Sequence, residues 1–151
     1  HIKELVATYR ERYGELGYRE NVVYEGIYEL LDSLKEQGFR MGVCTSKFEK
    51  YAIKVLEEFK LDRYFDFVSG SSGFGVAKSD QLRDLLEERE IVGNSLMIGD
   101  RYIDLSSAHK TGLHSAGVLW GYGSEEELAA ERPRFIAESP ARFGELLIET
   151  T

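Results

Sequence analysis

Two carboxylates, Asp100 and Asp104, stand four positions apart directly after a short apolar run. The run, residues 95–98, predicts a buried strand, and Gly99 lets the backbone turn sharply behind it. Asp100 then lies at the carboxyl end of that strand, where open parallel sheets bind ligands, and Asp104 lies in the first turn of a following helix. Carboxylate oxygens so placed suit Mg²⁺, which proteins hold with one or two carboxylates, phosphate oxygens and water. The same residues also fit the plainer roles of a turn residue and a helix cap.

A second polar group, Thr45, Ser46 and Lys47, follows another predicted strand. A threonine hydroxyl and a backbone N–H near the start of a helix are groups that bind phosphate. Lys78 stands just before a predicted helix, where the helix dipole repels a cation, so an anion opposite this lysine is favoured. The alternatives are ordinary helix-capping roles for Thr45 and Ser46, and a surface position for Lys78.

Other residue types that carry chemistry give weaker signals. The glycine-rich segment 70–79 is not a P-loop, because two residues separate its last glycine from Lys78, and nucleotide binding by that route is rejected. His109 and His114 have no metal-ligand spacing with other residues. Cys44, inside a predicted strand, is more simply a packed thiol than a nucleophile.

The elements that must position these residues follow from the apolar periodicity of the chain. The predicted strands are residues 39–44, 65–69, 95–98 and 113–120. The predicted helices are residues 2–16, 24–37, 48–59, 79–90, 104–109, 125–130 and 141–148. Strands that alternate with helices predict βαβ units and therefore an α/β fold, a doubly wound parallel sheet with helices on both faces. Residues that follow the strands of such a sheet converge on one edge, which brings the two polar groups together.

Composition and charge narrow the classes of function. The chain has 151 residues, 42% of them hydrophobic, and a net charge of −8, which suits one domain with a substantial core. The negative charge and the lack of a basic patch argue against nucleic-acid binding. No apolar run approaches the roughly 20 residues that span a bilayer, so no membrane partner is expected. A single cysteine excludes an intrachain disulfide and favours a reducing, cytoplasmic location.

The ordered set of motifs resembles the haloacid dehalogenase superfamily of phosphohydrolases, most closely its phosphoglycolate phosphatase-like members with a helical cap. Residues 43–47 are similar to the family's second motif, Lys78 to its third, and residues 98–104 to its fourth. Residues 107–112 and 117–123 are also similar to this subgroup. The resemblance runs from about Tyr24 to the end of the chain and implies a Rossmann-like core.

The resemblance implies a Mg²⁺-dependent phosphatase that hydrolyses a small phosphorylated metabolite, phosphoglycolate-like, through a covalent aspartyl-phosphate. Thr45 and the Ser46 amide then hold the phosphoryl group, Lys78 neutralises its charge, and Asp100 binds Mg²⁺ directly. Asp104 supports the metal through water or orients Lys78. These roles agree with phosphoryl transfer, which depends mostly on positioning and charge stabilisation.

The family's first motif, Asp-x-Asp-x-Thr, supplies the nucleophile and has no match in the sequence. The chain is therefore expected to be a fragment that is inactive alone, with the nucleophile on an N-terminal segment of the same protein. Residues 1–22 are then the last helix of a truncated helical cap plus a linker, and residues 23–151 are the core domain. The sheet is expected to lack its middle strand, which leaves apolar faces and backbone groups uncovered.

Two other functions stay open. One is a phosphomutase, or a phosphatase for another small metabolite, within the same family. The other is a catalytically silent α/β module that binds a phosphorylated ligand or a protein partner. A module like the receiver of a response regulator is disfavoured, because a receiver places its acidic pair before its Thr and Lys, whereas Asp100 follows both.

Overall fold

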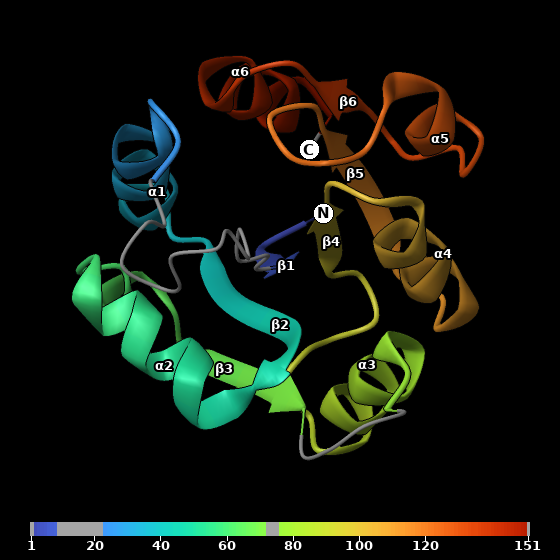
Figure 1. Cartoon of the computed structure of the whole chain (residues 1–151). Coiled ribbons are helices and arrows are strands. Elements are labelled where there is room, and N and C mark those ends of the chain that lie inside the picture. The colour runs from blue at the N-terminus through green and yellow to red at the C-terminus, as the bar shows by residue number, and fades with distance from the viewer. Residues whose placement is uncertain (1, 9–22, 72–75, 151) are drawn as a thin grey trace.

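A computed structural model describes residues 2–8, 23–71 and 76–150 of the chain. These residues form a six-stranded sheet in the order β3-β2-β1-β4-β5-β6, and every neighbouring pair of strands is parallel. Helices cover both faces of the sheet, with α3 and α4 on one side and α1, α2 and α6 around the other (Figure 1). The predicted α/β, Rossmann-like fold is confirmed.

The strands are β1 (Glu4–Thr8), β2 (Arg40–Phe48), β3 (Phe67–Ser71), β4 (Leu96–Gly99), β5 (His114–Val118) and β6 (Ile136–Ala137). The helices are α1 (Ile27–Glu36), α2 (Glu49–Glu58), the 3₁₀ helix η2 (Asp62–Tyr64), α3 (Lys78–Glu87), α4 (Tyr102–Lys110), α5 (Glu125–Ala129) and α6 (Pro140–Thr150). Most of them lie within a few residues of the predicted bounds. Within the described ranges, no helix combines the length and the apolar character needed to cross a membrane.

The helix predicted over residues 2–16 is wrong for its first part, because Glu4–Thr8 form strand β1. Residues 9–16 of that prediction lie outside the described residues. Leu5 packs among buried side chains of α1, α2 and α6, whereas the next residue, Val6, packs among those of α3 and α4. Adjacent apolar residues are compatible with the buried face of a helix and also with a strand that is buried on both faces. The strand forms here because this segment can pair with β2 and β4.

Strand β1 occupies the middle of the sheet, where a gap was predicted. It pairs with β2 on one edge and with β4 on the other, so that Leu5 lies beside Met41 and Leu96. This pairing satisfies buried backbone groups of β2 and β4 that a gap would leave open. The prediction of a sheet without a central strand is therefore wrong for this structure. The assignment of residues 1–22 to a cap helix falls mainly on residues outside the described part.

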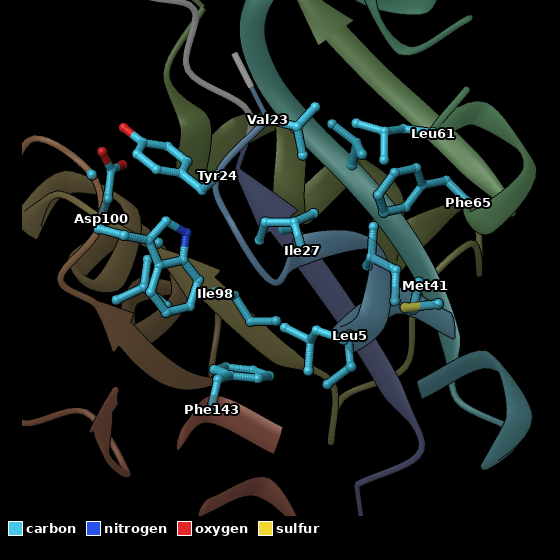
Figure 2. Close-up of a pocket in the computed structure, with 18 of the residues that line it drawn as sticks. Leu5, Val23, Tyr24, Ile27, Met41, Leu61, Phe65, Ile98, Asp100 and Phe143 are labelled. Carbon is cyan, nitrogen blue, oxygen red and sulfur yellow. The ribbon is translucent and has the colours of Figure 1, made fainter. Parts of the chain in front are cut away.

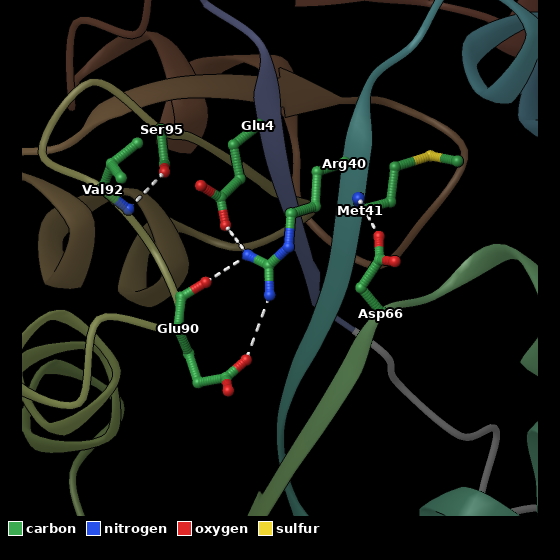
Figure 3. A network of polar contacts seen from close by, with 7 residues as sticks. All are labelled: Glu4, Arg40, Met41, Asp66, Glu90, Val92 and Ser95. Carbon is green, nitrogen blue, oxygen red and sulfur yellow. Dashed lines mark hydrogen bonds and ion pairs between the residues drawn. The ribbon is translucent and has the colours of Figure 1, made fainter.

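An ion-pair network ties β1 to its neighbours at the amino end of the sheet (Figure 3). Arg40 of β2 donates through Nη1 to Glu4 Oε1 of β1, at 2.5 Å, and to the carbonyl of Glu90 behind α3. Its Nη2 lies 3.1 Å from Glu90 Oε2. Glu4 is 5% exposed, so Arg40 provides the positive charge that a covered carboxylate requires. The network fixes the register of β1 against β2.

We expect Arg40→Ala to lower the free energy of unfolding by about 2 kcal/mol. Removing one partner of a fully buried pair costs roughly 3–5 kcal/mol, and the cost here is smaller because the Arg40 side chain is 42% exposed. Urea unfolding measures the change. Arg83→Ala is the matched control, since Arg83 pairs with the exposed Asp80 and its loss costs less than about 0.5 kcal/mol. Equal losses for the two variants would contradict a specific role for Arg40.

Candidate active site

Four polar side chains singled out from the sequence lie at the carboxyl edge of the sheet. Thr45 lies near the end of β2, Lys78 begins α3, Asp100 follows β4, and Asp104 lies in the first turn of α4. All four are buried. A Cβ added to Gly99 would lie 2.3 Å from the Cβ of Asp104, so the residue before Asp100 packs directly against Asp104. The β4–α4 turn therefore holds both carboxylates in one place.

Lys78 and Asp104 form an ion pair in the protein interior. Lys78 Nζ donates to Asp104 Oδ1 at 3.0 Å, and the two side chains are 4% and 0% exposed. Asp104 Oδ2 also accepts the backbone N–H of Arg101 at 3.2 Å, which fixes the carboxylate at the start of α4. The structure thus places an anion opposite Lys78, and a surface position for this lysine is excluded. Lys78 is held pointing into the edge of the sheet in spite of the unfavourable helix dipole.

Asp100 is enclosed by the loop that follows β5. Its Oδ2 accepts the backbone N–H of Tyr122 at 2.8 Å. A Cβ on Gly121 would lie 2.2 Å from Asp100 Oδ2, and one on Gly123 would lie 2.1 Å from the Asp100 carbonyl oxygen. Only glycine permits an approach this close. The loop therefore sets the direction of the Asp100 carboxylate.

We expect Gly121→Ala to destabilise the protein by about 1–3 kcal/mol, because the new methyl group overlaps the Asp100 side chain in a packed site. Gly93→Ala is the control, since a Cβ at Gly93 meets no atom within 4 Å. Its expected effect lies within about 0.5 kcal/mol. Thermal unfolding of the two variants measures the difference. Equal melting temperatures for the two variants would show that the loop does not press on Asp100.

Thr45 is connected to α3 by a residue that the sequence did not single out. Gln81 Nε2 donates to the carbonyl of Thr45 at 2.8 Å, and Gln81 lies one helical turn after Lys78 on the same buried face. Thr45 Oγ1 accepts the N–H of Lys47 at 3.2 Å, as in a turn. Among the described residues, Gln81 Oε1 is a buried oxygen without a hydrogen-bond partner. Ser46 is exposed and lies three positions before α2 begins.

The Cys44 thiol precedes Thr45 in β2 and is not a nucleophile. It is fully buried, and burial raises the pKa of Cys44 to about 11, with the charge of Lys78 acting in the opposite direction and that of Asp104 in the same direction. The thiol is protonated near neutral pH and therefore unreactive. The prediction of a packed thiol is confirmed.

A cavity of about 240 Å³ lies between the sheet and α1 (Figure 2). Its walls are mostly apolar, with Leu5, Ile27 and Phe143 among the residues that line it. Tyr24 and Asp100 line the same cavity and carry their oxygen atoms at one end of it in Figure 2. Asp100 therefore lies between the carboxyl edge of the sheet and an apolar interior, where charge interactions are stronger than in water.

The donor atoms at this edge suit a magnesium ion. Within the part of the chain that the structure describes, no cluster of three or more His, Cys, Asp or Glu side chains is arranged to hold a metal. Mg²⁺ needs only one or two carboxylates, since water and phosphate oxygens complete its shell. Both oxygens of Asp104 accept hydrogen bonds, from Lys78 and from Arg101, whereas the Asp100 carboxylate is oriented by a loop. Asp100 and Asp104 are the two carboxylates at this edge that could hold the ion.

Comparisons with known proteins identify the family of the chain. The sequence profile of the haloacid dehalogenase-like hydrolases matches residues 1–118. A 5'-nucleotidase of Pseudomonas aeruginosa is 37% identical over 147 residues, which cover 95% of this chain and 66% of that protein. A phosphoglycolate phosphatase of Aquifex aeolicus is 31% identical over 157 residues, with 96% and 72% covered.

A solved structure is similar over the same region. The crystal structure of a predicted phosphatase from Clostridium acetobutylicum superposes with a TM-score of 0.83 at 40% sequence identity, and the match covers 89% of this chain and 64% of that one. The chain therefore spans between 64% and 72% of the length of these three relatives.

Proposed function

Because the chain belongs to the haloacid dehalogenase-like hydrolases, we propose that it carries the phosphate- and metal-binding part of a Mg²⁺-dependent phosphatase for a small phosphomonoester. The observation that carries this proposal is the buried Lys78–Asp104 pair at the same edge of the sheet as Thr45 and Asp100. A covered cation beside hydroxyl and carboxylate groups is suited to stabilise the charge of a transferring phosphoryl group. Relatives named as phosphatases support the same reaction class.

In this proposal each residue has a separate task. The Thr45 hydroxyl and the Ser46 amide bind the phosphoryl oxygens, and the Lys78 ammonium neutralises their charge. Asp104 keeps Lys78 in place, and Asp100 would hold Mg²⁺, which supplies a second positive charge to the phosphoryl group. The preorganised positions of these groups lower the cost of concentrating charge during transfer.

The nucleophile is proposed to lie outside the 151 residues, which contain no Asp-x-Asp-x-Thr sequence. A carboxylate oxygen of that segment attacks phosphorus, and the bond between phosphorus and the ester oxygen breaks. A second aspartic acid of the same segment donates a proton to the ester oxygen, so the substrate leaves as an alcohol. Water then hydrolyses the resulting aspartyl-phosphate to release inorganic phosphate. We call a polypeptide that contains the 151 residues together with such a segment the extended protein.

The substrate in this proposal is a small phosphorylated metabolite of the phosphoglycolate type. The relatives bear two different names, 5'-nucleotidase and phosphoglycolate phosphatase, so another metabolite ester or a phosphomutase reaction is the alternative within the family. A cytoplasmic location is part of the proposal, because Cys44 is a free, buried thiol of the kind that reducing compartments maintain.

Hydrolysis of p-nitrophenyl phosphate with Mg²⁺ tests the proposal. We expect turnover by the extended protein, loss of turnover with EDTA, and no turnover by the 151 residues alone. Mg²⁺-dependent turnover by the 151 residues, abolished by Asp100→Asn, would show that the nucleophile lies within them. An extended protein that binds inorganic phosphate but hydrolyses no ester would instead favour the catalytically silent module.

A further inference from the structure

Glu127 of α5 contacts the turn that carries Asp100. Its Oε2 accepts two hydrogen bonds, from Arg101 Nε at 2.8 Å and from the backbone N–H of Tyr102 at 2.9 Å. Tyr102 is the first residue of α4, so this N–H has no partner within the helix. Glu127 itself is anchored by its own N–H, which donates to Ser124 Oγ at 3.2 Å. A single carboxylate oxygen thus joins α5 to the beginning of α4.

The electrostatics of this contact favour the charged form of Glu127. The hydrogen bond from Arg101 lowers the pKa of Glu127, and the bond from the Tyr102 amide lowers it further. A carboxylate at the amino end of α4 is also favoured by the helix dipole. An exposed ion pair alone contributes little to stability, and the Arg101 and Glu127 side chains are 39% and 26% exposed. The bond to the backbone of Tyr102 is what sets this contact apart from a surface ion pair.

Glu127 completes a continuous set of contacts with Asp100 and the two residues that follow it. The Tyr122 amide donates to Asp100 Oδ2, and Gly123 lies against the Asp100 carbonyl. Four residues later, Glu127 accepts from Arg101 and Tyr102. The segment 121–127 therefore contacts the β4–α4 turn at three points: the Asp100 carboxylate, the Asp100 carbonyl and the first amide of α4.

We propose that Glu127 is a positioning residue, which keeps the β4–α4 turn in the conformation that presents the Asp100 carboxylate to a divalent cation. Its role toward the cation rests on the proposed function, in which Asp100 binds Mg²⁺. Groups that orient a metal ligand from outside the coordination sphere change metal affinity by roughly 10–100-fold when they are removed. Glu127 is predicted to act at this level, through Arg101 and Tyr102, without touching the cation or the substrate.

The test compares Glu127→Ala and Glu127→Gln with Glu126→Ala, the exposed neighbour in the same turn. The first measurement is amide hydrogen exchange of the 151-residue chain without metal. We expect Glu127→Ala to raise the exchange rate of the Tyr122 amide at least about tenfold. This amide donates its hydrogen bond to Asp100, so its exchange reports whether the Asp100 carboxylate has kept its position. Exchange in the centre of β4 should stay unchanged, which separates a loosened turn from general destabilisation.

The second measurement is the affinity for Mn²⁺, followed by quenching of Trp120, the only tryptophan of the chain and a neighbour of Asp100 along the cavity. We expect Glu127→Ala to raise Kd at least about tenfold. Glu127→Gln should stay within about threefold of the original chain, because its amide oxygen can accept the same two hydrogen bonds. Glu126→Ala should change neither measurement.

Two results would overturn the proposal: exchange at Tyr122 that is the same in Glu127→Ala and Glu126→Ala, or a Glu127→Gln variant as impaired as Glu127→Ala. A chain that binds no Mn²⁺ in any variant would count against the proposed function. The exchange rates at Tyr122 would still decide whether Glu127 holds the turn, so the two failures are distinguishable.

Discussion

Lys78→Ala is expected to lower kcat of the extended protein by at least about 100-fold and to destabilise the fold by roughly 3–5 kcal/mol. The loss of kcat is the usual effect of removing one preorganised charge from a transition state. The loss of stability arises because the substitution leaves the fully buried carboxylate of Asp104 without its cation. The first quantity is measured by steady-state hydrolysis of p-nitrophenyl phosphate, and the second by urea unfolding of the 151-residue chain.

The double variant Lys78→Met with Asp104→Asn separates the two effects. It removes both charges from the interior, so most of the stability is expected to return while kcat stays low. Lys110→Ala is the matched control, because Lys110 is an exposed lysine at the carboxyl end of α4. A fall in kcat of less than threefold for Lys78→Ala, in a variant that still folds, would remove Lys78 from the catalytic machinery.

Asp100→Asn is expected to abolish Mg²⁺-dependent hydrolysis by the extended protein, with a loss of at least about 100-fold. Groups that only orient a metal ligand lower metal affinity or activity by roughly 10–100-fold when they are removed. Loss of the metal ligand itself should lower activity by more. The fold should survive, because the amide oxygen of asparagine can still accept the N–H of Tyr122. Activity measured across a Mg²⁺ titration, together with thermal unfolding, distinguishes a lost ligand from a lost fold.

Asp84→Asn is the control for this substitution, since Asp84 is an exposed carboxylate on α3. It should leave both the activity and its Mg²⁺ dependence unchanged. If Asp100→Asn retained activity at the original Mg²⁺ concentration, Asp100 would not be a metal ligand. The proposed division of tasks, with Asp104 orienting Lys78 and Asp100 facing the ion, would then be wrong.

The sheet and most of its helices could be predicted because their apolar patterns are local. The short apolar run that contains Met97 and Ile98 predicts a buried strand, and the structure has β4 there. The pattern of Ile2, Leu5 and Val6 suits a helix and a strand equally, so the choice depended on the gap between β2 and β4, which lies far away in the sequence. The two-residue strand β6 is defined by its pairing with β5, and two residues are too few to show an apolar pattern that would predict a strand.

The charged groups of the candidate site could be named from the sequence, but the residues that connect them could not. Lys78 attracts attention by its place just before a helix, and Asp104 by its spacing from Asp100. Gln81 and Glu127 bond to the backbone of Thr45 and Tyr102, 36 and 25 positions away, and any sequence offers a backbone amide or carbonyl there. The position of Gln81, three residues after Lys78, was the only signal that the two share a helix face.

The central place of β1 has a consequence for the order in which the chain assembles. Its pairing with β2 closes a loop of moderate length, whereas its partner on the other edge, β4, lies about 90 positions along the chain. Until β4 is available, β1 presents an open row of amide and carbonyl groups at the border of an unfinished sheet, a template for association between molecules. Truncated chains that end before Leu96 should therefore aggregate more than the 151-residue chain, in which β4 pairs with both β1 and β5.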